Sequence, residues 1–463
     1  TVVVAFVLFG QGLFLSGGSG FFTDIAMALM GRYRGGQAKI AIIASALFGT
    51  ISGSVVANVV STGVVTIPMM KRAGYRPHVA AAVEAVASTG GQLMPPVMGV
   101  AAFLMAEFLQ VPYATIAVAA LIPAVIYFAA LFIQVDLEAA RHGIQRVPES
   151  DIPRTLDVLK AGWFIPIPFA ILIAGIFWLN FSLDLAALYA LVAVLVSGMV
   201  LGYRGQRLNR RSLIDVFRTT GLGVLDIFMI APLAGIVIGV LNITGLSFSL
   251  ALSLVALAGG SVIGLLLLTG GVSIVLGMGM PTVGVYILLA TLVAPALIQI
   301  GIDPLAAHLF IFYYGMLSMI TPPVAIGAFA AASISGSRAM QTGFAAVRFG
   351  WSAFVIPFLF IFSDSMLLRG GPVETVIDIA TALAAVWLIA AGFTGYSVRR
   401  IGAAQRIGFV IAGAGLLIPV NLFGGSHLLN LVGLGLGGAL LAFDLTQRRA
   451  QAADTLAQKE LRT

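Results

Sequence analysis

Cysteine and charge are scarce in this 463-residue chain. The chain has no cysteine, which excludes disulfide bonds and thiolate metal sites. Only 9% of its residues are charged, whereas a soluble domain carries about 25%. Hydrophobic residues make up 60% of the chain, and the mean hydropathy is +1.07. Most of this surface must face lipid rather than water, so the sequence predicts an integral membrane protein.

The few polar groups indicate neither an enzyme nor a nucleic-acid-binding protein. The net charge is +7, but the basic residues form short clusters between apolar runs and no continuous basic face. We find no nucleophile–base pair and no metal-ligand spacing, so we expect no catalysis, no cofactor and no metal apart from a transported ion. The four dispersed histidines are His78, His142, His308 and His427.

Long apolar runs predict an all-α membrane fold with about 11 crossings and two re-entrant hairpins. Two apolar stretches, 38–70 and 260–298, have Gly-rich centres. The first is too short for two crossings plus a turn, so we interpret both as re-entrant helical hairpins. The predicted crossings are 1–15, 78–109, 112–134, 161–180, 184–203, 220–242, 304–334, 349–367, 373–396, 407–423 and 427–444.

The distribution of Lys and Arg tests this layout. With residue 1 outside, each crossing switching sides and each hairpin returning to its own side, 24 of the 25 basic residues fall in inside loops. Only Arg369 lies outside. Cytoplasmic loops of membrane proteins are enriched in Lys and Arg, so the charge pattern favours this topology.

A Pro pair follows each Gly-rich centre at the same distance. Ser54 and Pro95 are 41 positions apart, as are Pro281 and Pro322. The predicted topology opens the first hairpin inward and the second outward, so the halves are predicted to be inverted repeats, which are typical of secondary transporters. We expect a first repeat with scaffold helices at 1–203, a second repeat at 204–368, and extra C-terminal helices with a cytoplasmic tail at 369–463.

The hairpin centres and Pro pairs predict a binding site for an ion and a substrate. A Pro pair frees backbone carbonyls, and unwound backbone is tolerated in a membrane only where protein encloses it or it lines a watery cavity. Both features also have structural alternatives, namely close helix packing for Gly and Ser, and bonding to the helix backbone for hydroxyls. The candidates are Ser52, Gly53, Ser54, Asn58, Thr89, Gly90, Gln92, Pro95, Gly279, Pro281, Thr282, Ser318, Thr321 and Pro322.

Three ionisable residues within apolar runs are candidates for ion coupling. Glu84 precedes the first Pro pair in a run of Ala and Val, Asp226 lies in the crossing before the second hairpin, and His308 begins the second broken helix. Intramembrane charges mark ion pathways, although Glu84 has the alternative of a structural, paired carboxyl. Asp226 and His308 lie nearer helix ends, from which a side chain can reach the interface. The coupling ion is expected to be sodium or a proton.

With these segments in place, the chain resembles the large M-type membrane subunit of TRAP transporters over about residues 1–367. The contexts Val83–Ala85 and Phe312–Met316 look most like the TAXI branch, often made as fused permeases. The residues that carry the resemblance are Arg34–Gly36, Ala44–Ser54, Ile67–Tyr75, Leu93–Pro96, Gly277–Thr282, Gly301–Pro304 and Ser318–Val324.

The resemblance implies an elevator-type secondary transporter in the cytoplasmic membrane of a bacterium or archaeon. Such subunits take organic acids from a periplasmic substrate-binding protein, use an ion gradient that is usually sodium, and work with a small Q-type subunit or fused segment. Glu84 stands where ordinary M-type subunits have small or apolar residues, so a proton becomes a candidate ion. No Q-like segment precedes the match, which suggests N-terminal truncation, and the helices beyond about 370 lie outside the usual pattern.

Two other readings of the sequence stay open. The first is a stand-alone di- or tricarboxylate symporter that needs no binding protein. The second is a channel, which should show a continuous polar stripe through several helices; polar residues here are concentrated at the two breaks instead.

Overall fold

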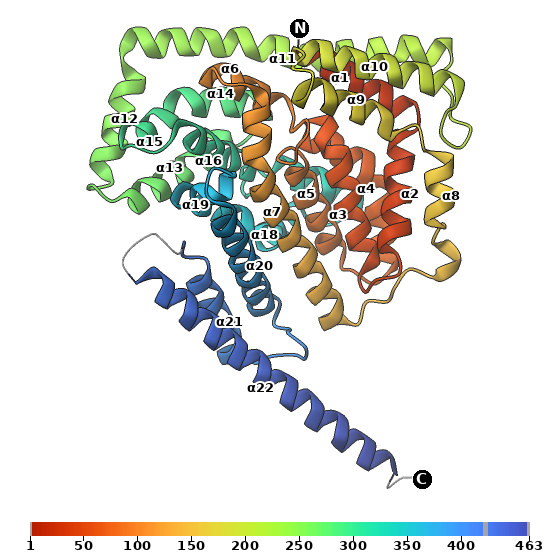
Figure 1. The fold of residues 1–463 in the computed structure, drawn as a ribbon, viewed down its shortest axis with the longest axis vertical. Helices are drawn as coiled ribbons and strands as arrows, with labels where there is room; N and C mark the ends of the chain where they lie inside the picture. Colours follow the sequence, from red (N-terminus) through yellow and green to blue (C-terminus); the bar gives the residue numbers. More distant parts are fainter. Residues whose placement is uncertain (1, 420–424, 461–463) are drawn as a thin grey trace.

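The chain folds into helices joined by short connections, as a computed structural model shows (Figure 1). The structure describes residues 2–419 and 425–460, and it describes the backbone alone at 226, 227, 230, 231, 234, 242 and 451–460. These described residues contain helices and no sheet. The predicted all-α membrane fold is therefore confirmed.

Several helices are long and apolar enough to cross a bilayer. Among the described residues six helical segments qualify, two of which consist of two consecutive helices, or nine spans if each of three bent helix pairs counts as one. The predicted number of 11 crossings stays a prediction. The six segments are Tyr113–His142, Leu183–Val200, Thr282–Gln299, Ala339–Phe362, Pro372–Thr394 and Ser426–Ala450.

Two series of helices repeat the same order. Each series starts with a bent pair, continues with a helical hairpin and ends with a helix broken in two; the bends are 67° and 70°. The first series is α1 (Val2–Leu15), α2 (Gly18–Met30), α3 (Gly36–Ser52), α4 (Val55–Arg72), α5 (Pro77–Gly91) and α6 (Val100–Leu109). The second is α11 (Arg210–Thr244), α12 (Leu246–Leu257), α13 (Val262–Gly277), α14 (Thr282–Leu292), α15 (Ala294–Gln299), α16 (Pro304–Leu317) and α17 (Ile326–Ser335).

Landmarks in the two series lie 227 residues apart. Ser54 precedes α4 and Pro281 precedes α14, while α5 begins at Pro77 and α16 at Pro304. Each start has a local cause: Ser54 caps α4 by accepting a hydrogen bond from the Ala57 N–H, and Pro at the first helical position has no N–H to leave unpaired. The shared offset matches corresponding positions of α4 with α14, and of α5 with α16.

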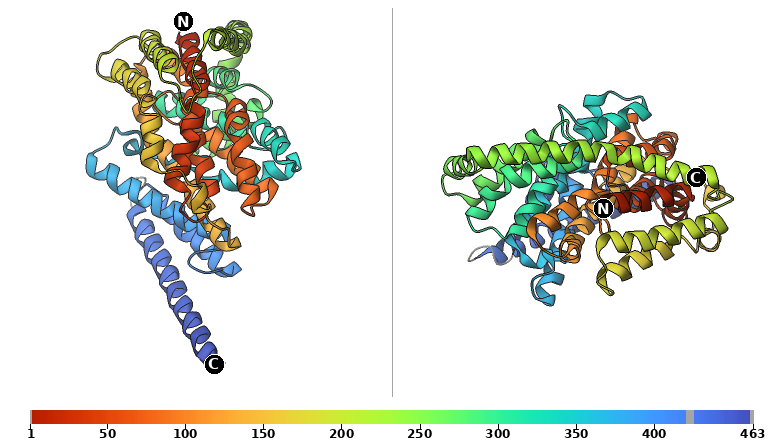
Figure 2. Two further views of the ribbon diagram at one scale, coloured as in Figure 1. Left: turned by 90° about the vertical axis from the view of Figure 1, so that its right-hand side faces the viewer. Right: turned by 90° about the horizontal axis from the view of Figure 1, so that it is seen from above.

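The remaining helices connect and flank the two series. α22, drawn in blue, extends away from the body of the molecule (Figures 1 and 2). Between the series lie α7 (Tyr113–His142), η1 (Glu149–Asp151), α8 (Thr155–Ala161), α9 (Pro166–Phe177) and α10 (Leu183–Val200). After the second series follow α18 (Ala339–Phe349), α19 (Trp351–Phe362), η2 (Asp364–Leu367), α20 (Pro372–Thr394), α21 (Ala403–Leu416) and α22 (Ser426–Glu460).

The last half-helix of each series packs into the other series. α6 contacts α14 and α16, and α17 contacts α4 and α5. The same relationship holds in both directions, as a pseudo-twofold arrangement requires. This exchange places the two helix breaks within one interlocked block.

The hairpin at 38–70 forms as two helices, α3 and α4, that pack along each other and meet at Gly53 and Ser54. The stretch 260–298 likewise forms α13, α14 and α15. Their re-entrant placement in the bilayer and the inverted orientation of the repeats stay predictions. Helix α11 starts ten residues before the predicted crossing at 220–242, because hydropathy does not mark a polar helix start that includes Arg211 and Arg218.

Candidate functional site

The tip of the first hairpin touches the first helix break through backbone alone. Gly53 ends α3 in the left-handed region, with φ +59°. A Cβ placed on Gly53 would lie 3.0 Å from the Cα of Gly99, the residue that precedes α6 and has φ +91°. Both the conformation and the contact favour glycine. The tip is thereby held against the break without a side chain between them.

A second glycine pair lets α3 and α5 approach just before these points. A Cβ on Gly49 would be 2.4 Å from the Cα of Gly91, closer than any real Cβ contact. Asn58 of α4 completes the junction, because its side-chain amide donates to the Ser45 carbonyl at 2.9 Å. The hairpin is therefore packed closely against α5 through backbone atoms, and one buried amide ties α4 to α3 within the hairpin.

The first break spans 92–99, around the Pro pair. Its freed carbonyls at Pro96 and Val97 lie 2.9 and 2.7 Å from the Tyr113 hydroxyl, which can donate to either. The Gln92 side chain is 1% exposed, and neither its amide nitrogen nor its oxygen has a hydrogen-bond partner among the described residues. A buried amide without partners is costly, so Gln92 is free to bind a ligand or a water molecule.

The second break spans 318–325 and mirrors the first. Ser318 reaches the tip of the second hairpin, with its hydroxyl 3.0 Å from the Gly277 carbonyl and 2.6 Å from the Gly315 carbonyl. The Gly327 N–H donates across the break to the Met319 carbonyl at 2.9 Å. Both breaks are thus tied to the hairpin of their own repeat.

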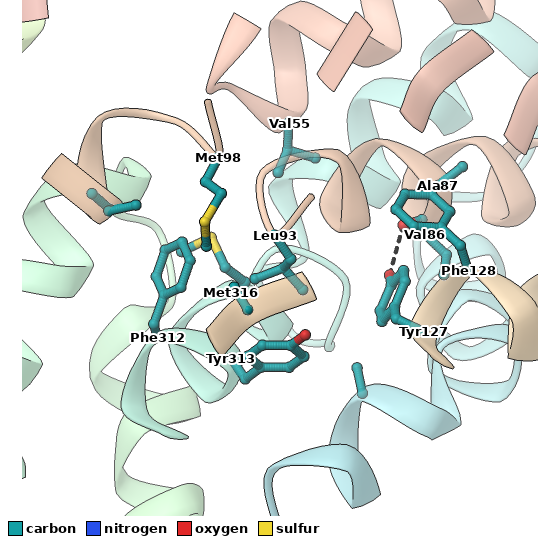
Figure 3. Close-up of a cluster of buried hydrophobic side chains, with 14 of the residues drawn as sticks. Val55, Val86, Ala87, Leu93, Met98, Tyr127, Phe128, Phe312, Tyr313 and Met316 are labelled. Carbon is teal, nitrogen blue, oxygen red and sulfur yellow. Dashed lines mark hydrogen bonds between the residues drawn. The ribbon is translucent and has the colours of Figure 1, made fainter. Parts of the chain in front are cut away.

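Apolar side chains from both repeats fill the space between the breaks (Figure 3). Leu93 and Met98 of the first break point toward Phe312 and Met316 of α16. On another side of the block, Val55 at the start of α4 leaves room only for glycine, because a Cβ on Gly327 would lie 2.6 Å from its methyl group. Side chains of the two repeats therefore pack against each other between the breaks.

Glu84 sits in a closed cage of hydroxyl groups and is 0% exposed. Its Oε1 lies 2.8 Å from Ser45 Oγ, 2.5 Å from Thr62 Oγ1 and 3.4 Å from Ser88 Oγ. Its Oε2 lies 2.5 Å from Thr66 Oγ1. Ser45 belongs to α3 and both threonines to α4, so this carboxyl joins the hairpin to α5.

A cavity of about 120 Å³ opens between the bent pair α1–α2 and the tip of the first hairpin. Most of its lining is apolar, including Phe14 and Phe48. The polar side chains in its lining are all uncharged: Gln11, Ser19, Ser52 and Ser61. Neutral donors of this kind can bind a carboxylate by hydrogen bonds but supply no ionic partner.

Comparison with known proteins identifies the family. Residues 1–400 match the family model described as "Tripartite ATP-independent periplasmic transporter, DctM component". The chain belongs to this family. It is 27% identical over 358 residues to the C4-dicarboxylate TRAP transporter large permease protein DctM of Pseudomonas aeruginosa, covering 77% of this chain and 82% of that protein.

More distant relatives of this DctM-family permease carry other substrates in their names. The sialic acid TRAP transporter permease SiaT of Haemophilus influenzae is 25% identical over 72% of this chain, which spans about half (52%) of that longer protein. The ectoine/5-hydroxyectoine TRAP transporter large permease UehC of Ruegeria pomeroyi is 25% identical over 72% of this chain and 77% of its own length.

The DctM-family chain brings some of the sequence candidates together at the tips and breaks and uses others for packing. Ser52, Gly53, Ser54 and Pro95 are partly exposed around the first tip and break. Gly279, Pro281 and Thr282 lie at the second tip, and Thr321 and Pro322 in the second break. The hydroxyls of Thr89 and Thr321 donate to carbonyls of their own helices at 2.8 and 2.7 Å, and a Cβ on Gly90 would lie 2.2 Å from the Tyr127 ring.

The other two ionisable candidates, His308 and Asp226, do not belong to the hydroxyl cage around Glu84. His308 is buried beside Tyr286, whose hydroxyl lies 2.7 Å from His308 Nδ1, and the Phe108 ring packs against both residues. This pair links α14 to α16, far along α16 from the second break. The backbone of Asp226 belongs to α11, but its side chain lies outside the described residues.

Our sequence reasoning missed the partners of Glu84 in this permease. Thr62 and Thr66 follow the predicted site residue Asn58 at intervals of four on one face of α4, and this spacing is a detectable signal of a polar helix face. Ser88 lies four positions after Glu84 in α5 and carries the same signal, whereas Ser45 does not. The polar residues Gln11, Ser19 and Ser61 at the cavity were also missed, because each is isolated in its run.

Proposed function

We propose that this chain is the large membrane subunit of a TRAP uptake system in a bacterial cytoplasmic membrane, and that it imports a small organic acid. A periplasmic substrate-binding protein delivers the acid, a small Q-type subunit or fused segment completes the permease, and an ion gradient drives uptake. The family supports the transporter class. The relatives named for C4-dicarboxylates and sialic acid support the substrate class.

The cavity at the first hairpin tip is the observation that carries the substrate class. It offers the Gln11 amide and the Ser19 hydroxyl as hydrogen-bond donors, together with apolar walls. The Ser52 and Ser61 hydroxyls donate to the Ser54 and Ala57 carbonyls in the structure and would have to turn to a substrate. A small carboxylic acid has both a strong acceptor group and an apolar or hydroxylated carbon chain, which this lining matches. The absence of a charged side chain from this lining favours weak, reversible binding, which suits a carrier that must release its substrate.

The interlocked block of α3–α6 and α13–α17 is proposed to move as one body against the remaining helices, as in an elevator. The exchange of α6 and α17 between repeats supports this, because separating the repeats would break packing on both sides. The sequence around Glu84 and the Phe312–Met316 run support placement in the TAXI branch.

Uptake by proteoliposomes tests the proposal. The complete permease would be reconstituted with and without its binding protein, and labelled succinate and sialic acid would be offered under sodium and pH gradients. We expect uptake of one acid only when the binding protein is present. Ser52→Ala is expected to weaken uptake, while Ser333→Ala, an exposed serine that bonds only its own helix, serves as the matched control.

Three results would contradict the proposal. Equal uptake without the binding protein would favour a stand-alone symporter. Ion currents that depend on no substrate would favour a channel. Failure to accumulate any of these acids under either gradient would remove the proposed substrate class.

A further inference from the structure

The Glu84 cage has no counterpart among the described residues of the second repeat. The positions that lie 227 residues after the polar residues of α4 and α5 at the cage are all apolar or glycine, and all are buried. Asn58, Thr62, Thr66, Glu84 and Ser88 correspond to Val285, Leu289, Val293, Ile311 and Gly315. The same hairpin and broken helix are therefore built in the second repeat without a carboxyl at the position of Glu84, so the architecture does not require one there.

No charged group balances Glu84 among the described residues. Its hydrogen-bond partners are four hydroxyls, and it forms no ion pair. Other titratable groups on the packed helices lie toward helix ends or bond elsewhere; for example, Lys39 pairs with Asp136 and Arg348 with Glu138. These groups are Asp24 on α2, Lys39 on α3, Lys71 and Arg72 on α4, His78 on α5, Tyr113, Tyr127, Asp136, Glu138, Arg141 and His142 on α7, and Arg348 on α18.

The cage fits the carboxyl in both of its protonation states. Thr66 Oγ1 lies 2.5 Å from Glu84 Oε2 and 3.0 Å from the Thr62 carbonyl. A hydroxyl has one hydrogen and two lone pairs. When Oε2 carries a proton it donates to Thr66 Oγ1, whose own hydrogen goes to the Thr62 carbonyl. When Glu84 is ionised, the Thr66 hydrogen turns to Oε2 instead.

The Thr62 and Ser45 hydroxyls can likewise point their hydrogens toward or away from the other carboxyl oxygen, Oε1. Thr62 Oγ1 lies within 2.5 Å of Oε1 and 2.8 Å of the Asn58 carbonyl, and Ser45 Oγ lies 2.8 Å from Oε1 and 3.0 Å from Thr62 Oγ1. Rotation of hydroxyl hydrogens therefore accommodates the gain or loss of one proton without moving heavy atoms. The ionised form gains charge-assisted hydrogen bonds in place of a counter-ion.

The spacing of the oxygens favours a proton over a metal cation. Oxygen ligands of a hard cation such as Ca²⁺ lie about 2.3–2.6 Å from the ion, which keeps neighbouring ligand oxygens roughly 3 Å or more apart. Three hydroxyl oxygens of the cage lie only 2.5 to 2.8 Å from a Glu84 oxygen, in direct hydrogen-bond contact. A cation would have to push these oxygens apart, whereas a proton fits between them.

We propose that Glu84 is a proton-binding site that couples the pH gradient to the seating of the first hairpin on α5. This rests on the proposed function and deepens it by naming the coupling ion. The carboxylate takes one proton from the outer side to become a carboxylic acid, and gives it up on the inner side. The hydroxyls of Ser45, Thr62 and Thr66 belong to α3 and α4, so each change of protonation state changes the strength of the hydrogen bonds that hold the hairpin to α5.

Infrared difference spectroscopy of the purified permease tests the site without transport. Spectra would be recorded between acidic and alkaline buffers, each with sodium or potassium as the only salt. We expect a protonated-carboxyl band that disappears on alkalinisation in both salts, is lost in Glu84→Gln, and is kept in Glu107→Gln, an exposed glutamate that serves as control. The proposal is overturned if the Glu84 band never changes, is absent from the wild type, or responds to sodium rather than pH.

Transport by the same variants separates this inference from the proposed function. Glu84→Gln imitates the protonated state, so we expect it to keep exchange of labelled for unlabelled acid while losing accumulation driven by a pH gradient. Thr66→Val should shift the pH at which accumulation is half-maximal, and Thr66→Ser should restore it. If the wild type transports and Glu84→Gln accumulates equally well, the coupling role of Glu84 fails alone. If the wild type transports none of the acids, the proposed function fails, while the infrared result still decides the site.

Discussion

The contact between Gly49 and Gly91 gives a prediction whose size follows from geometry. In Gly49→Ala the new Cβ would lie 2.4 Å from the Gly91 Cα and 2.7 Å from the Asn58 amide nitrogen. Carbon atoms in contact prefer about 3.5–4.0 Å, so α3 and α5 have to separate by roughly 1 Å. Overpacking of this kind costs about 1–3 kcal/mol.

A matched control isolates that cost. Gly271 is an exposed interior position of α13, and a Cβ there meets nothing within 4 Å. Alanine is better than glycine in a helix by about 1 kcal/mol, and both substitutions gain that term. The free energies of unfolding of the two variants should therefore differ by about 1–3 kcal/mol, with Gly49→Ala the less stable.

Equilibrium unfolding in mixed micelles, followed by tryptophan fluorescence, measures this difference. Uptake by the same proteins in liposomes is expected to fall in Gly49→Ala and to stay unchanged in Gly271→Ala, because only the first shifts the hairpin on α5. Equal stability and equal uptake of the two variants would refute the close approach of α3 and α5.

Three further substitutions have defined expectations. Tyr113→Phe removes the donor to the carbonyls of the first break and should lower the unfolding free energy by about 0.5–1.5 kcal/mol, measured in the same micelles. Asp444→Asn leaves the Arg399 guanidinium without its buried carboxylate and should cost about 3 kcal/mol; an unchanged midpoint would show that the pair contributes nothing. Tyr286→Phe removes the buried hydrogen bond to His308, and a double-mutant cycle with His308→Phe should give a coupling of about 1 kcal/mol, so additive single effects would exclude the bond.

Features with a local cause were predictable from the sequence. The breaks fall at the two Pro pairs, because proline has no backbone N–H to donate in a helix, whatever the surrounding tertiary structure. The first hairpin turns at Gly53, since glycine adopts the left-handed conformation readily. Most of the predicted crossing at 161–180 is the helix α9, Pro166–Phe177, but this helix bends by 58° against α8. That bend depends on how two helices pack, which hydropathy does not record.

Features with a long-range cause were not predictable. A threonine such as Thr62 in an apolar helix looks the same in sequence whether it bonds its own backbone or a carboxyl 22 positions away. Whether the carboxyl lies within reach of Thr62 depends only on how α4 and α5 cross. A carboxyl in an apolar run is unusual by itself, so Glu84 could be identified from the sequence. Its hydrogen-bond partners could not.

The exchange of α6 and α17 has a consequence for how the chain is made. The first repeat leaves the ribosome with the α4–α5 face that α17 covers still bare, and α17 follows only after α7–α16 have been synthesised. At about 5–20 residues per second, the more than 200 intervening residues correspond to a delay of roughly 10–50 s. The nascent first half must stay in the membrane with an uncovered helix surface for that time. Its Glu84 cage, built from α3, α4 and α5 alone, can already be closed.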